Sequence, residues 1–143
     1  MNVTMLLCDA AQVAEGKLYI LGAGWSIIGP EPTASAIALK MAVEGGEIDG
    51  EHEWQLALLD EAGQGVVIET PEGPHPAEVQ GEFRVRRPDG LPEGSPVDVA
   101  LAVNLGPLPL QTGQRFAWRL TVDGRTEAGW TLPFATRAAQ GGA

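Results

Sequence analysis

The densest group of side chains suited to metal binding is the acidic stretch "EGGEIDGEHE". Its carboxylates are those of Glu44, Glu47, Asp49, Glu51 and Glu53. Calcium is held by several converging carboxylate oxygens, and a loop between two strands can supply them. The spacing does not match an EF-hand loop, and a solvated hairpin loop is the preferred explanation of the same residues. A calcium site made of Glu44, Glu47, Asp49 and Glu51 therefore stands as an alternative prediction.

A second stretch with binding-site residue types is "KLYILGAGW", in which Gly22 and Gly24 follow an apolar strand. Dinucleotide-binding loops begin in this way, but they need a third glycine and a helix that meets the phosphates. Ile27 stands at the third position, and the following "SIIGPEP" has two prolines and no helical pattern. The segment therefore predicts a bulge or bend without a nucleotide. Trp25 is expected at the end of the domain, accessible to a partner.

Nucleophilic catalysis has little support in the residue types. None of the three serines lies in a G-x-S-x-G motif. Cys8 can form a Cys–His pair only with His52 or His75, and it lies in an apolar strand where a cysteine usually packs as a small hydrophobe. We therefore predict a protein that is not an enzyme and has no cofactor.

The composition bounds the class of partner. The chain has 143 residues, a length typical of one domain, and a net charge of −10. This charge argues against nucleic acid and against anionic membrane surfaces, because both would be repelled. A single cysteine and the lack of a signal-peptide pattern favour a cytoplasmic protein, and the abundant alanine, glycine and arginine are typical of a high-GC bacterium.

Apolar residues alternate with polar ones along most of the chain. The clearest example is "TASAIALKMAVE", where Ile37, Leu39, Met41 and Val43 share one face. Similar patterns occur in "HEWQLALLD", "EVQGEFRVR", "VDVALAVNL", "RFAWRLTVD" and "TEAGWTLPF". The pattern predicts an all-β, immunoglobulin-like antiparallel sandwich of about seven to nine strands, with a closed β-barrel as the alternative. We expect one domain over residues 1–135 and a flexible tail over residues 136–143.

Turn residues divide these strands. Asp123-Gly124 suits a type I′ turn and is the strongest hairpin signal. The connection "DAAQVAEG" after the first strand is expected to hold a single helical turn capped by Asp9. The stretch "TPEGPHPAE" is expected to be a turn.

The predicted function is a binding or assembly module that contacts a protein partner or a second copy of itself. We expect the contacts at Asp9 and Gln12 in the first loop, at Gly22, Gly24 and Trp25 in the second, and at an exposed sheet edge. Replacing Trp25 by alanine is then expected to weaken binding and leave the melting temperature nearly unchanged. The small outer faces around Ala36, Ala38, Ala42, Ala100 and Ala102 favour close approach of another sheet, although compositional bias explains them too.

The phrases "CDAAQVAEGKLYILGAGW" and "LAVNLGPLPL" resemble a family of small, uncharacterised actinobacterial proteins classed as a domain of unknown function. The resemblance covers most of the chain, from Met1 to Phe134, although Gly-Gly-Gly is more usual where this chain has Gly22-Ala23-Gly24. It implies a β-sandwich fold and implies no activity, cofactor or site residue.

Overall fold

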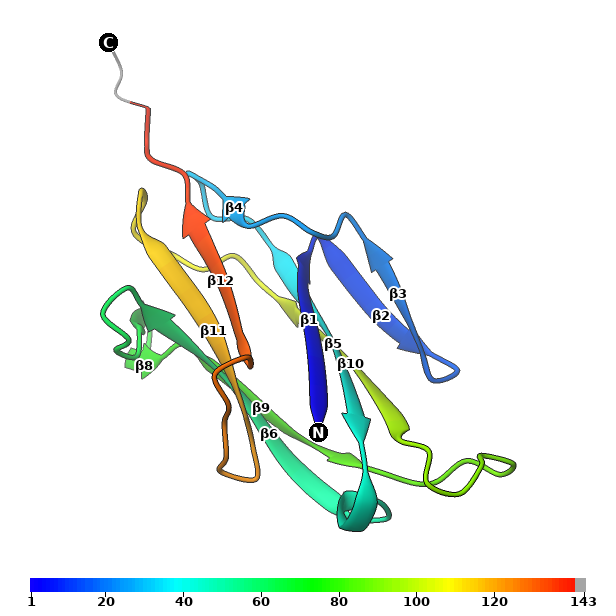
Figure 1. The fold of residues 1–143 in the computed structure, drawn as a ribbon. Coiled ribbons are helices and arrows are strands. Elements are labelled where there is room, and N and C mark those ends of the chain that lie inside the picture. Colours follow the sequence, from blue (N-terminus) through cyan, green and yellow to red (C-terminus); the bar gives the residue numbers. More distant parts are fainter. Residues whose placement is uncertain (141–143) are drawn as a thin grey trace.

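The computed structural model describes residues 1–140, and two facing β-sheets make up most of the fold (Figure 1). The three-stranded sheet has the order β1 (Asn2–Cys8), β5 (Ser35–Val43), β10 (Val97–Leu105). The five-stranded sheet has the order β4 (Ile27–Ile28), β12 (Thr131–Thr136), β11 (Arg115–Val122), β6 (Glu51–Asp60), β9 (Glu78–Arg84). The predicted all-β sandwich is confirmed, and neither sheet closes on itself as the barrel alternative required.

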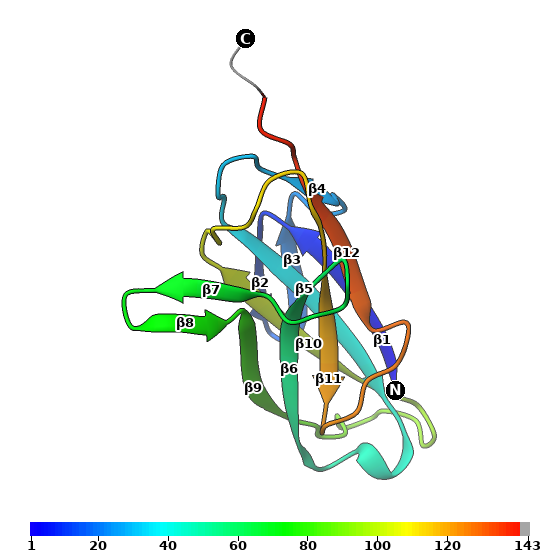
Figure 2. The ribbon, with the colours of Figure 1, turned by 90° about the vertical axis from the view of Figure 1, so that its left-hand side faces the viewer.

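Two hairpins and one short helix lie outside these sheets. They are β2 (Ala10–Ala14) with β3 (Lys17–Leu21), β7 (Val67–Thr70) with β8 (Gly73–Pro76), and the 3-10 helix η1 (Gly45–Glu47). The eight strands of the two sheets agree with the predicted number, and the hairpins raise the total within residues 1–140 to twelve. The β7–β8 hairpin projects sideways from the sandwich (Figure 2). The stretch "TPEGPHPAE" was predicted to be a simple turn, but its residues "GPHP" form strand β8. The hairpin therefore corrects this prediction.

The core lies between the two sheets, where the alternating apolar faces meet. Ile37, Leu39 and Met41 of β5 are fully buried, as are Leu56 of β6 and Leu120 of β11. Adjacent side chains in a strand point to opposite faces of the sheet. Each strand therefore needs only one apolar face to contribute to the core between the sheets. The predicted inward face of β5 is confirmed. In the stretch "TEAGWTLPF" the alternation predicts Ala128 on the inward face with Trp130, but Ala128 is exposed in the turn before β12.

The segment after β1 forms a strand rather than the predicted helical turn. Glu15 and Gly16 have φ angles of 53° and 72°, so both occupy the left-handed region that a two-residue type I′ turn needs. Ala14 and Lys17 pair on either side of this turn. The helix prediction failed because alanine favours helices locally, whereas pairing with β3 gives this segment a partner for its backbone.

The β2–β3 hairpin covers part of the small outer face that the sequence left open to another subunit. Cys8 and Ala36 are fully buried and Ala38 nearly so, in a cluster with Ala11 and Leu18 of the hairpin. The side-chain amide of Asn104 on β10 fixes the hairpin. Its Nδ2 donates to the Ala11 carbonyl at 2.9 Å, and its Oδ1 accepts the Ala11 N–H at 3.3 Å.

The chain end departs from the predicted boundary by one residue. Thr136, placed in the tail by the sequence, is the last residue of β12 and is buried, with its hydroxyl donating to the Gln111 carbonyl at 2.6 Å. Residues 141–143 of the predicted flexible tail lie outside the described residues. Within residues 1–140, no helix has the length and apolarity needed to cross a membrane.

Candidate functional site

Four of the five predicted contact residues meet where β1 passes into the hairpin. The N–H of Asp9 donates to the carbonyls of both Leu21 and Gly22, at 3.0 and 3.1 Å, so the pairing of β2 with β3 begins with a bulge. The Gly24 N–H donates to the Leu7 carbonyl at 3.0 Å and ties the second loop to β1. Gly22 has a φ of 61°, and a Cβ there would collide with the Asp9 carboxylate.

Trp25 joins this cluster through its indole N–H, which donates to Asp9 Oδ1 at 3.2 Å. Its ring packs against the main core, so the side chain is only half exposed and closes one end of the sandwich. The expected position at the end of the domain is confirmed. Because the ring contributes to core packing, Trp25→Ala is now expected to lower the melting temperature, which corrects the expectation of nearly unchanged stability.

Gln12, the fifth predicted contact residue, does not lie in this cluster. It is on the outer face of β2, opposite Tyr19 of β3. Tyr19 is 53% exposed and Leu21, on the same face, is 71% exposed. Val13 and Ile20, on the other face, are also exposed. We call Gln12, Val13, Tyr19, Ile20 and Leu21 the hairpin surface.

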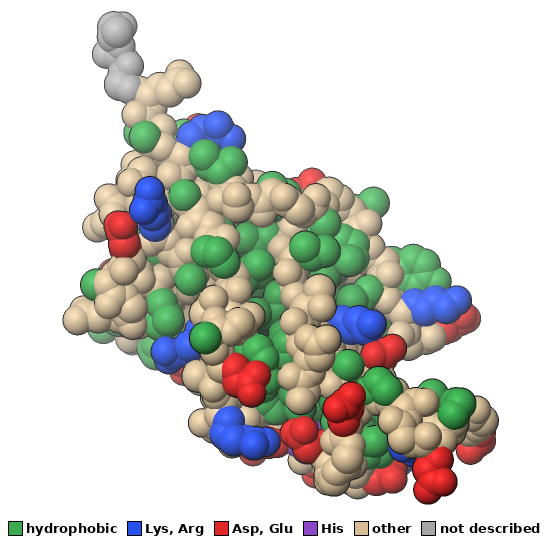
Figure 3. Space-filling view, viewed as in Figure 1, with side chains coloured by type: hydrophobic (Ala, Val, Ile, Leu, Met, Phe, Trp, Pro, Cys, Tyr) green, Lys and Arg blue, Asp and Glu red, His purple; other side chains and the backbone are tan. Residues whose placement is uncertain are grey.

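Hydrophobic exposure is concentrated on this surface. Among residues 1–140, seven large hydrophobic residues are exposed, and four of them belong to the hairpin surface. Leu6, another of the seven, is on the outer face of β1. In Figure 3 hydrophobic side chains gather over β1 and the β2–β3 hairpin, whereas acidic side chains gather at the opposite end, near η1 and the β9–β10 loop. Exposed apolar groups in one place, rimmed by polar residues, indicate an interaction site.

The sequence reasoning did not select Tyr19, Ile20 or Leu21. A hairpin pattern that includes them is present in the sequence. Two short segments in which side chains alternate between faces, "AAQVA" and "KLYIL", flank the turn residues Glu15-Gly16. Glu is an uncommon first residue for a type I′ turn, and alanine is a weak strand former, so the hairpin pattern was faint.

The acidic stretch does not assemble the calcium site of the alternative prediction. Glu47 pairs with Arg125 at 3.5 Å, Glu51 pairs with Arg84 at 3.2 Å, and Asp49 accepts the Arg87 N–H at 3.4 Å. Glu44 is exposed. Among residues 1–140 no three His, Cys, Asp or Glu side chains lie as a metal-binding group. The carboxylates are close in sequence but are directed to different partners.

His52 links the acidic stretch to the β11 hairpin turn. Its Nδ1 lies 2.6 Å from Asp123 Oδ2, and its Nε2 lies 2.8 Å from the Glu47 carbonyl. Both partners are acceptors, so the ring satisfies both only when it carries two protons. The ring also stacks on Phe83 at 5.2 Å. Asp123 is held further by the Glu53 N–H at 2.9 Å.

This arrangement moves both pKa values. The hydrogen bond to Asp123 raises the pKa of His52, against the opposing effect of burial. The same bond, with that from the Glu53 N–H, lowers the pKa of Asp123. The pair thus favours the imidazolium–carboxylate state and fastens the η1 loop to the β11 turn. Both ring nitrogens of His52 are thus engaged within the fold.

The His52 pair predicts a pH dependence of stability. A raised folded-state pKa contributes stability below the unfolded value of about 6.5 and loses it as the pH rises through the folded value. We therefore expect the melting temperature to fall as the pH rises above about 6.5 and through the raised pKa of His52. Thermal denaturation of wild type and His52→Gln checks this: the variant should lose that slope, and the control His75→Gln, at an exposed residue of β8, should keep it. An unchanged slope in His52→Gln would contradict the assignment.

Among residues 1–140, the contacts that the structure shows for the Cys8 thiol include no histidine that could act as its base. The thiol is fully buried beneath the hairpin, and Sγ donates to the Ala36 carbonyl at 3.5 Å. Burial raises the pKa of the Cys8 thiol, and the neighbouring Asp9 charge adds to this. A protonated, buried thiol packs as a hydrophobe and is a poor nucleophile.

Two hollows in the surface also differ from a small-molecule site. A cavity of about 40 Å³, lined by Leu7, Trp25, Trp118 and Phe134 among others, lies at the end of the sandwich. Ligand pockets usually measure roughly 300–1,000 Å³, so this cavity is far too small. A broader hollow of about 630 Å³ on the outer face of β6 and β9 is polar, with Glu53 directly opposite Glu82. Its lining is more polar than that of most ligand pockets, although Trp54 contributes to it.

Comparison with known proteins supports the resemblance at the level of the family. A model of DUF6941, described as a family of unknown function, matches residues 3–135. Searches among curated proteins and among solved structures found no match to this chain.

Proposed function

The chain belongs to DUF6941, a family of unknown function, and we propose that it is a non-enzymatic protein-binding module of the bacterial cytoplasm. It binds its partner through the hairpin surface and the adjoining Asp9–Trp25 cluster. The observation that carries this proposal is the concentration of exposed apolar side chains on the hairpin, led by Leu21 and Tyr19.

The construction of the hairpin supports this role. Asn104 holds β2 at Ala11, and the N–H of Asp9 bonds to the end of β3, so the hairpin that presents the apolar side chains is fixed at the end opposite its turn. A surface that is ordered before binding loses less conformational entropy when a partner docks. The acidic surface elsewhere, with a net charge of −10, disfavours nucleic acid and anionic lipid as alternative partners.

Differential affinity capture tests the proposal. Tagged wild type, Leu21→Ser and Val67→Ser are used as baits in the native cell extract, and the proteins retained are quantified by mass spectrometry. Val67 is a matched control because it is 60% exposed but lies on the distant β7–β8 hairpin. We expect wild type and Val67→Ser to retain a stoichiometric partner, which is either another protein or the untagged chain. Leu21→Ser should retain at least about tenfold less of this partner, because a central apolar anchor is typically worth more than 1 kcal/mol of binding free energy.

Both exposed substitutions should leave folding intact, with changes within about 0.5 kcal/mol. Equal retention of partner by Leu21→Ser and wild type would contradict a role for the hairpin surface. Equal loss in Val67→Ser would show that the apolar exposure acts non-specifically.

A further inference from the structure

The outer edge of β3 has unpaired backbone groups. Ala11 and Ile20 are directly opposite each other in the hairpin, and the Ala11 N–H and carbonyl point to Asn104, away from β3. In an antiparallel pair, two opposed residues that do not bond to each other both point their backbone groups outward. The N–H and carbonyl of Ile20 therefore face the free edge, as do those of Leu18 two residues earlier. Within residues 1–140 no other segment pairs with them.

This edge lacks the usual protection against strand pairing. Natural edge strands carry prolines, bulges or charged side chains that block a further strand. The residues from Leu18 to Leu21 are all apolar or aromatic, and the only charge in β3 is Lys17 at its start. The β9 edge differs, because its outward side chains include Glu78, Glu82 and Arg84.

The free groups of β3 are complementary to those of a second β3. In an antiparallel pair related by a two-fold axis at Tyr19, Leu18 lies opposite Ile20 of the other copy, and each such pair exchanges two hydrogen bonds. The N–H groups and carbonyls of Leu18 and Ile20, four groups in each copy, are then all hydrogen-bonded. Tyr19 meets Tyr19 of the other copy, and Leu21 lies opposite Lys17 of the other copy, whose aliphatic stem can cover it.

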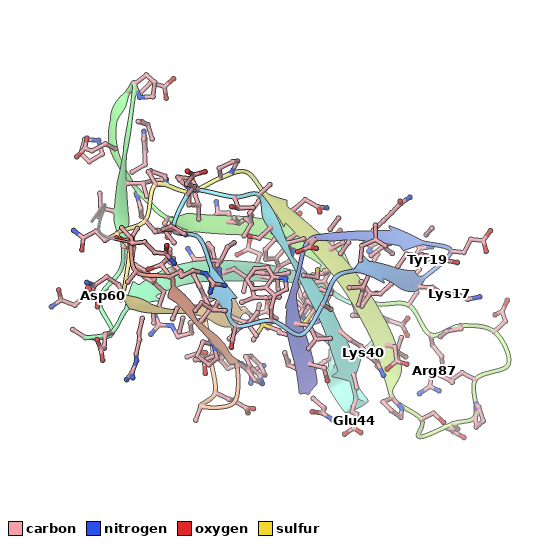
Figure 4. All side chains as sticks on the ribbon, turned by 90° about the horizontal axis from the view of Figure 1, so that it is seen from above. Lys17, Tyr19, Lys40, Glu44, Asp60 and Arg87 are labelled. Atoms are coloured by element: carbon pink, nitrogen blue, oxygen red, sulfur yellow. The ribbon has the colours of Figure 1, made fainter. Side chains whose placement is uncertain are left out.

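The charged residues near the two ends of β3 are also complementary in this register. Lys17 is at one end of β3 and Asp9 at the other, where its N–H bonds to Leu21. Antiparallel pairing brings Lys17 of each copy toward Asp9 of the other, so opposite charges approach. Lys17 and Tyr19 lie toward the margin of the molecule, on the β2–β3 hairpin (Figure 4).

We propose that the partner of the hairpin surface is a second copy of this chain, joined by two-fold antiparallel pairing of β3 with β3. This inference rests on the proposed function and specifies its partner. A five-residue strand is much smaller than a standard interface of about 800 Å² per partner, so the dimer forms in a concentration-dependent equilibrium.

Disulfide trapping tests the register. The Tyr19 pair is of the closely spaced kind, with Cα atoms about 4.5 Å apart, within the range of roughly 4.4–6.8 Å that a disulfide spans. Tyr19→Cys is therefore expected to cross-link to itself on mild oxidation. Lys17→Cys is not, because its own counterpart is displaced along the strand by roughly 13 Å. Lys17→Cys mixed with Leu21→Cys is expected to cross-link. The native Cys8 is fully buried and does not compete.

Ile20→Pro tests the backbone hydrogen bonds. It removes an N–H that faces the free edge and takes no part in the pairing with β2, so the hairpin is retained. Sedimentation equilibrium should show a dimer dissociation constant raised at least about tenfold, because each of the two copies loses one hydrogen bond. A thermal transition near that of wild type shows that the chain is folded.

The outcomes separate the two proposals. A wild-type chain that stays monomeric, with no cross-link in Tyr19→Cys, overturns the two-fold pairing. If Leu21→Ser nevertheless loses a captured protein, the hairpin surface binds a different chain, and the proposed function stands alone. If Leu21→Ser also loses nothing, both proposals are wrong. Cross-linking of Lys17→Cys as strongly as Tyr19→Cys also contradicts the register.

Discussion

Replacing Trp118 by alanine is expected to lower the free energy of unfolding by about 3–5 kcal/mol, as is typical of a large aromatic side chain removed from a core. Trp118 is in the middle of β11, 2% exposed, with Leu58 and Leu132 on the flanking strands. It also lines the 40 Å³ cavity at the sandwich end. The space left by the removed indole ring would join this cavity. The neighbouring side chains would then fill little of the enlarged cavity, which keeps the loss of stability large. Urea denaturation of wild type and variant measures the difference.

Indole provides a second test of this reasoning. An engineered apolar cavity stays dry and binds apolar molecules of matching size. Indole should therefore raise the melting temperature of Trp118→Ala, by mass action on the folded state, and leave that of wild type unchanged. Trp118→Phe serves as the matched control, because it keeps most of the ring volume and should lose much less stability. A loss below about 1 kcal/mol in Trp118→Ala would show that the residue is not packed as described.

Replacing Gly81 by alanine is expected to cost about 1–3 kcal/mol, the range for overfilling a packed site. Gly81 on β9 lies directly opposite Trp54 on β6, and the indole ring occupies the place where a side chain would be. A Cβ on Gly81 would lie 2.8 Å from Cζ2 of Trp54, with two further ring atoms at 2.9 Å. Either the ring or the strand must move. Chemical denaturation gives the change in the free energy of unfolding.

Gly65→Ala is the matched control, because a Cβ there meets open space and the residue has no unusual backbone conformation. Its effect should be within about 0.5 kcal/mol. A double-mutant cycle with Trp54→Leu isolates the contact: once the indole is shortened, the Gly81→Ala substitution should be less damaging. If Gly81→Ala and Gly65→Ala have the same effect, the proposed role of the glycine in seating Trp54 is wrong.

The two ends of the molecule have different properties. At one end, His52, Asp123, Glu47 and Arg125 connect the η1 loop to the β11 turn through short polar contacts. At the other, the hairpin presents apolar side chains and an unpaired backbone edge. The first arrangement satisfies its polar groups internally, whereas the second leaves them available to another chain, which is why the binding proposal rests on the hairpin.

The amino-acid sequence by itself determined the sandwich. The side chains of a strand alternate between two faces, so the residues of β5 that become the core are identifiable from their spacing alone. The Asp123-Gly124 turn was equally local: its φ angles of 50° and 77° are those that this residue pair favours. The family resemblance came from the sequence as well and is supported by the family match.

The site depended on tertiary structure, because its contacts join residues far apart in the chain. Asn104 binds Ala11 across 93 positions, and this contact satisfies the backbone groups of Ala11 that point away from β3. In the same way, the carboxylates of Glu47, Asp49 and Glu51 are neighbours in sequence, but the positions of Arg125, Arg87 and Arg84 direct them apart. Local patterns specify which face of a strand is apolar, whereas only the docking of the strands decides which edge and which polar groups remain unpaired.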